Sequence, residues 1–166
     1  MSDSSESKRL WRTALIVAGV GLLVLVPLSW LALRMYDDTI QRRVISANES
    51  AALGSLEAVQ AAEQLYYESN GQYATFQQLL DAGIFQAELN GDPPVAHGYA
   101  FTLRVQPKTG AQPAAYTVNA DPVRDDGRDA TGRRHFFISS DVTGVRFNES
   151  RPATKDDKPR PTVRDY

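Results

Sequence analysis

The sequence contains no cysteine and only two histidines among its 166 residues. The absence of cysteine excludes disulfides and thiolate-bound metal sites within the chain. No acidic partner can be identified from the sequence for His97 or His135, so we expect neither a zinc site nor a catalytic triad. Glycine-rich phosphate loops are also lacking, and nothing supplies a base or an oxyanion hole beside Ser139-Ser140-Asp141. The sequence therefore predicts a protein that is not an enzyme.

A strong charge of one sign is lacking too. The formal net charge is −2 at pH 7. Residues 35–166 carry 14 basic and 18 acidic side chains, and these are scattered along the chain. Because nucleic-acid-binding domains present a concentrated basic surface, this mildly acidic composition predicts no nucleic-acid partner.

One segment has no charge at all. Residues 13–33 are predominantly apolar, and Arg12 and Arg34 bracket them. Twenty-one helical residues are enough to cross a hydrocarbon core about 30 Å thick at roughly 1.5 Å per residue. Trp11 and Trp30 stand where aromatic side chains anchor a membrane helix. A secretory signal peptide is the alternative, but its apolar region is shorter and ends at a better cleavage site.

These features divide the chain into four predicted parts. Residues 1–12 form a polar and basic cytoplasmic tail, and residues 13–33 form a single transmembrane helix. Residues 34–148 form one small domain outside the cytoplasm, and residues 149–166 form a disordered, proline-rich and charged tail. The orientation rests on the short basic N-terminus, because basic residues flank both ends of the span.

The transmembrane segment is expected to continue as an amphipathic helix up to Gly71. One side of this helix carries a small-residue stripe, defined as Ala47, Ala51, Gly54, Ala58, Ala61 and Leu65. Together with Ile40 and Val44, these residues step in fours and threes, as at a helix-packing seam. We expect the sheet of the same domain to cover the stripe, and a coiled-coil partner is the alternative.

The rest of the chain changes to strand periodicity after a short helix capped by Thr75 and Gln78. Tight turns connect the predicted strands, which favours an antiparallel meander. The strands span residues 97–105, 115–120, 134–139 and 145–147. The predicted fold is therefore α+β, a long N-terminal helix packed on a four-stranded antiparallel sheet.

Four segments carry a resemblance to a known family. They are residues 47–79, the HGYAFTL run at 97–103, AYTVNADPV at 115–123 and GRRHFFISSDVTGVRFN at 132–148. In this order they resemble bacterial type IV pilin-like and type II secretion pseudopilin-like proteins. The resemblance implies a helix half in the membrane, a small antiparallel sheet, and a place in the bacterial cytoplasmic membrane with the domain in the periplasm.

The pilin pattern is incomplete before the apolar segment. Pilins have a glycine, an aromatic residue and a nearby glutamate there, whereas this chain reads KRLWRTALIVAG at residues 8–19. The expected function is therefore that of a non-enzymatic accessory or scaffold subunit of a membrane assembly, bound to its other subunits and to the lipid bilayer. A minor pilin or pseudopilin of a pilus or secretion system is the alternative.

An acidic loop raises one further hypothesis. It contains Asp121, Asp125, Asp126 and Asp129, and oxygen-rich loops of this kind bind calcium. Some pseudopilins bind calcium in loops beside the sheet, so the resemblance also implies such a site. Arg124 and Arg128 oppose it, and a solvated loop is the simpler interpretation. A calcium- or ligand-binding sensor is accordingly a second hypothesis, and no other cofactor is expected.

Overall fold

The computed structural model describes the backbone of residues 3–85 and 93–160. It places the side chains of these residues except for residues 3–10, 12–22, 24 and 32. Residue contacts divide the chain into two compact units, Met1–Arg42 and Arg43–Tyr166. Helix α1 (Asp3–Asn70) contributes to both units, and each unit is considered by itself.

The first unit consists of the N-terminal part of α1. The helix begins at Asp3 instead of Thr13, so most of the predicted polar tail is helical. Large apolar side chains between residues 23 and 36 are solvent-exposed: Leu23, Leu25, Val26, Leu28, Trp30, Leu31, Leu33, Met35 and Tyr36. Among the residues searched, no helix is long and apolar enough to cross a membrane. The predicted span falls partly outside the described side chains, because those of residues 13–22 are not placed.

The second unit contains one antiparallel sheet with strand order β1-β2-β3-β4-β5-β6. Its strands are β1 (Val95–Ala96), β2 (Tyr99–Gln106), β3 (Ala115–Pro122), β4 (His135–Ser139), β5 (Val142–Asn148) and β6 (Lys158–Pro159). The prediction of an α+β fold with a long helix and an antiparallel meander is confirmed. The predicted count of four strands was wrong, because β1 and β6 have two residues each and are too short to show an alternating pattern.

Helix α2 (Phe76–Asp81) follows α1 after a short connection. The Thr75 side chain accepts from the Gln78 backbone N–H, and the Gln78 side chain accepts from the Thr75 N–H at 2.8 Å. This is the predicted capping box, and it satisfies two backbone donors that a helix N-terminus otherwise leaves free. Leu79 anchors the helix in the core, where it is completely buried.

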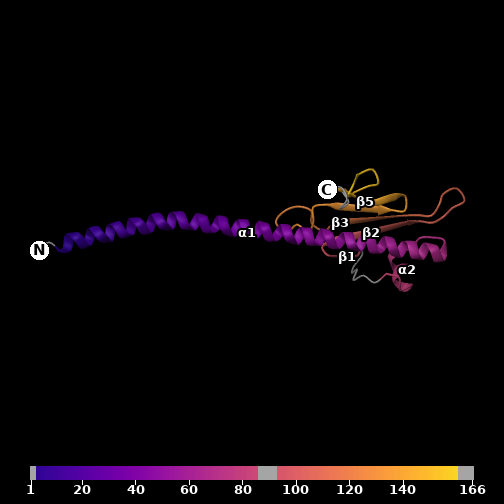
Figure 1. Ribbon diagram of the computed structural model, residues 1–166, viewed down its shortest axis with the longest axis horizontal. Helices are drawn as coiled ribbons and strands as arrows, with labels where there is room; N and C mark the ends of the chain where they lie inside the picture. The colour runs from indigo at the N-terminus through magenta and orange to yellow at the C-terminus, as the bar shows by residue number, and fades with distance from the viewer. Residues whose placement is uncertain (1–2, 86–92, 161–166) are drawn as a thin grey trace. The chain divides into compact units, whose positions relative to one another are not determined.

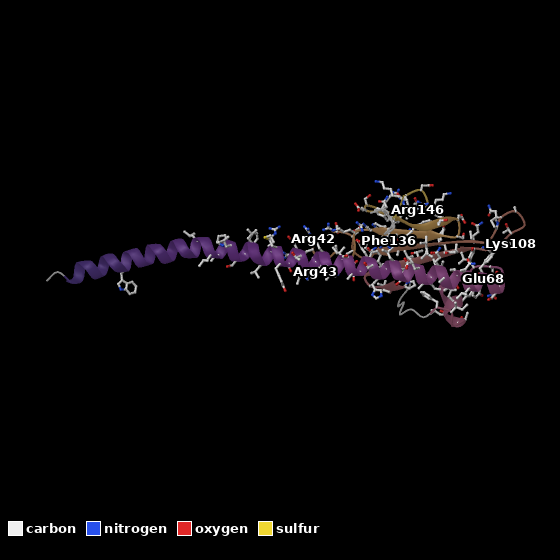
Figure 2. The ribbon with its side chains drawn as sticks, viewed as in Figure 1. Arg42, Arg43, Glu68, Lys108, Phe136 and Arg146 are labelled. Atoms are coloured by element: carbon white, nitrogen blue, oxygen red, sulfur yellow. The ribbon has the colours of Figure 1, made fainter. Side chains whose placement is uncertain are left out.

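The core of the second unit lies between the sheet and α1 (Figure 1). Alternate residues of β3 and β4, such as Val118 and Phe136, point into it because side chains in a strand alternate between the two faces. The core-facing residues of α1 are Ala52, Leu53, Leu56, Val59 and Ala62. Figure 2 shows Phe136 between the sheet and α1.

Residues 149–157 fold over the opposite face of the sheet, and this segment is called the cover below. The Asn119 side-chain amide on β3 donates to the Ala153 carbonyl oxygen at 2.8 Å, and both residues are buried. Asp157 holds the cover together, since it accepts from Asn148, Thr154 and Arg151 at 2.8 to 3.0 Å. The prediction of a disordered tail was therefore wrong for residues 149–160. Hydrogen bonds, instead of buried apolar side chains, hold this segment in place. Residues 161–166 of that tail lie outside the described residues.

Candidate protein-contact surface

The small-residue stripe does not face the sheet. Ala47, Gly54, Ala58 and Ala61 are exposed, and Leu65 is 54% exposed. Ala51 alone is half-buried. The prediction that the sheet covers this stripe was therefore wrong.

Side-chain volume explains the orientation of the helix. Leu56 and Val59 are completely buried against the sheet, and Leu53 is 6% exposed. Gly54 lies two positions after Ala52, or about 200° around the helix at roughly 100° per residue. The sheet thus packs on the larger side chains, which exclude more apolar area from water, and the stripe points away.

Three sectors therefore divide the surface of α1 in the second unit. The first packs on the sheet. The second carries exposed polar residues, among them Glu57, Gln60 and Gln64. The third is the stripe. Val44, which precedes Ala47 by three residues, lies beside it and is 45% exposed. No element described between residues 43 and 160 buries this third sector, so it is available for contact with another helix.

The acidic loop has a different environment from the one predicted. Asp121 Oδ1 lies 2.7 Å from His135 Nδ1, and Asp125 Oδ2 lies 3.7 Å from His135 Nε2. Asp126 and Asp129 are exposed in the same loop. No group of three or more potential metal ligands occurs in the part of the chain that the structure describes.

His135 has the acidic partners that sequence reasoning missed. The ring is buried, with 6% of the side chain exposed, and Nε2 has no hydrogen-bond partner among the described residues. The sheet register contains the missing signal. Ala120 pairs with Phe136, so the next antiparallel pair brings Asp121 beside His135. The pair fixes the start of the acidic loop to β4.

The end of the same loop is fastened to α1. Asn48 donates to the Thr131 carbonyl oxygen at 2.9 Å, and Glu49 accepts from the Arg133 backbone N–H at 3.1 Å. The Thr131 hydroxyl donates to the Gly98 carbonyl oxygen at 2.7 Å and also accepts from the Arg124 N–H. These contacts give the loop a structural role in joining the sheet to the helix.

Glu63 is the second residue that sequence reasoning missed. It is completely buried, and Oε2 accepts from the Ala74 backbone N–H at 2.9 Å. Burial raises the pKa of its carboxyl group to about 7, and the hydrogen bond from Ala74 opposes this rise. The spacing contained the signal, because Glu63 follows Leu56 by seven residues and Val59 by four, on the same side of the helix.

Comparison of the chain with protein-family models, with curated proteins and with solved structures found no match.

Proposed function

We propose that this chain is a non-enzymatic, membrane-anchored, pilin-like subunit that acts through helix-to-helix contacts within a membrane-bound assembly. The observation that carries this proposal is the exposed small-residue stripe. An Ala and Gly surface lets a second helix approach the backbone closely and exclude water from the contact along its length. The partner is therefore a helix of a neighbouring subunit.

The exposed apolar side chains of the first unit support membrane attachment. Leu23, Trp30 and Leu33 are 76%, 60% and 69% exposed, and apolar residues are exposed at consecutive positions as well as at helical spacing. A helix that is apolar on all sides is stable in lipid or in a protein interior, not in water. We propose that residues 13–33 anchor the chain in the cytoplasmic membrane, with the second unit outside the cytoplasm.

Single cysteines test the helix contact, because the natural chain has none. Ala58→Cys places a thiol on the stripe, and Gln60→Cys places one on the polar sector two positions later. Each variant is produced in its native membrane, labelled at its single thiol with a short maleimide-linked photo-cross-linker and irradiated, because the partner helix then needs no cysteine of its own. We expect Ala58→Cys to form a cross-linked product at least about 10-fold more abundant than that of Gln60→Cys.

The identity of the cross-linked product separates the two assembly types. A dimer of this chain indicates a filament-like array, and a product with a different membrane subunit indicates an accessory role. Equal cross-linking of the two variants, or none for either, would contradict the proposed contact.

Alkaline washing of membranes tests the anchor independently. The full chain should stay in the membrane pellet, whereas a chain lacking residues 1–33 should be released. Release of the full chain would show that residues 13–33 do not span the bilayer and would leave the stripe contact to be judged by cross-linking alone.

A further inference from the structure

Glu63 lies where α1, the connection to α2 and the sheet meet. Its Oε2 atom accepts from the Ala74 N–H at 2.9 Å, and its buried Oε1 atom has no partner among the described residues. Ala74 is itself completely buried and immediately precedes Thr75, the residue that caps α2. The Glu63 carboxyl group therefore holds the start of α2 against α1.

The titratable groups around Glu63 are tyrosines and one acid. Tyr73 from the connection and Tyr116 from β3 both interact electrostatically with Glu63, and their rings are 4.8 Å apart. Tyr67 stacks on Tyr73 at 4.7 Å, and Asp141 from the β4–β5 turn acts on Tyr73. None of these groups carries a positive charge, so no charge among the described residues around it compensates a carboxylate at Glu63.

We propose that Glu63 is a proton-controlled switch for the segment from Gly71 to Phe85, which is held on α1 more firmly while the carboxyl group is protonated and opens more often once it ionises. The neutral acid keeps one oxygen on the Ala74 N–H, and its remaining polar atom without a partner costs less to bury than a charge does. The ionised form is a buried charge with one hydrogen bond and no counter-ion, which water solvates better. This regulation is independent of the proposed membrane assembly.

The direction of the pH effect follows from the raised pKa. The pKa of Glu63 is about 7 in the closed form and starts from an ordinary value of 4.5 once the carboxyl group reaches water. The contribution of Glu63 to closure is complete below the lower value and is lost as the pH rises through the higher one. With these two values the equilibrium constant for opening rises about 10-fold between pH 6 and pH 8.

Amide hydrogen exchange of the full chain in detergent measures this opening. The reporters are the Ala74 N–H, which donates to Glu63, and the Leu79 N–H, which donates to the Thr75 carbonyl oxygen at 3.0 Å. The Val118 N–H in the central strand β3 reports global unfolding. After correction for intrinsic exchange, Ala74 and Leu79 should open about 10-fold more at pH 8 than at pH 6. The opening that exposes the Ala74 and Leu79 N–H groups should also need less free energy than the one that exposes the Val118 N–H. Low concentrations of urea should change it little, because a local opening exposes little surface.

Two variants complete the test. Glu63→Gln keeps an acceptor oxygen for the Ala74 N–H and cannot ionise, so its opening should not change with pH. Glu57→Gln removes an exposed carboxyl group from the same helix and should behave like the natural chain. The switch is refuted if opening in the natural chain is independent of pH. It is also refuted if Ala74 and Leu79 exchange only together with Val118, because Glu63 would then affect global stability alone. Both refuting results are measured in the natural chain, so the proposal can be tested even if the Glu63→Gln variant does not fold.

Discussion

Replacing Asn119 by alanine should destabilise the second unit through the cover at residues 149–157. Asn119 is 8% exposed as a whole residue, and its side-chain amide donates to the Ala153 carbonyl oxygen on the outer face of the sheet. Alanine removes this donor and leaves a buried carbonyl oxygen without it. Thr154, the next residue of the cover, donates its backbone N–H to Asp157. Loss of the Asn119 hydrogen bond to Ala153 should therefore also weaken the hydrogen bonds of Asp157.

The expected magnitude follows from the burial of both partners. A buried polar group left unsatisfied costs about 1–3 kcal/mol, and the loss of a typical hydrogen bond costs about 0.5–1.5 kcal/mol. These two figures describe the same interaction and are not added. We therefore expect Asn119→Ala to reduce the free energy of unfolding by about 1–3 kcal/mol. Thr143→Ala, at an exposed position of β5, should change it by less than about 0.5 kcal/mol.

Chemical unfolding of the intact chain provides the assay. Both tryptophans, Trp11 and Trp30, lie in the first unit, so their fluorescence does not report on the sheet. Near-ultraviolet circular dichroism of the tyrosines, or exchange of the Val118 N–H, follows the second unit instead. A double-mutant cycle with deletion of residues 149–166 isolates the contact, and Asn119→Ala should have a much smaller effect in the shortened chain. An equal effect in both chains would refute the role of the cover.

Three further predictions follow from the structure of the second unit. Val59→Ala should destabilise the second unit by about 1–3 kcal/mol because Val59 is fully buried, whereas Ala58→Leu should change its melting temperature little. Gly132→Ala should lower the melting temperature of the second unit, because the added methyl group would collide with the Tyr99 ring. Gly127→Ala is the control: its methyl group meets open space, so any loss of stability there comes from the positive φ alone. Hydrogen bonds from Asn148 and Thr154 hold the pKa of Asp157 well below its ordinary value, so this contribution to stability is present above the ordinary pKa and is lost in acid. Acid titration should show that loss in the natural chain and a flatter profile in Asp157→Asn.

The α+β fold could be predicted because most of its elements carry local signals. The strand patterns, the turns between them and the Thr75 capping box place five elements near their observed positions: α2, β2, β3, β4 and β5. The cover could not be predicted in this way. It contains a single buried alanine, and its order depends on Asp157 meeting Asn148 and Arg151 in space. A charged, proline-rich segment looks the same in sequence whether or not such partners meet.

The candidate surface was recognised in sequence but assigned to the wrong neighbour. Both apolar sectors of α1 have helical spacing, and their joint arc is too broad for periodicity alone to say which part the sheet covers. Leu53 and Glu63 decide the matter in the structure, since both are buried on the sheet side. A charged residue such as Glu63 is normally exposed, so composition alone does not place it on the sheet side.

The composition of the stripe explains how it can stay exposed to solvent in this unit with only a small loss of hydrophobic free energy. Ala47, Gly54, Ala58 and Ala61 have little side chain, so each exposes a small apolar area to water. An equally long row of leucines would form an apolar patch of the kind that drives aggregation. Small residues instead give weak attraction over most of the surface and strong attraction only to a helix that can approach the backbone closely along its length. Such a surface distinguishes partners by shape, so one large side chain at Ala58 should prevent association while leaving the sheet side of α1, and the fold, unchanged.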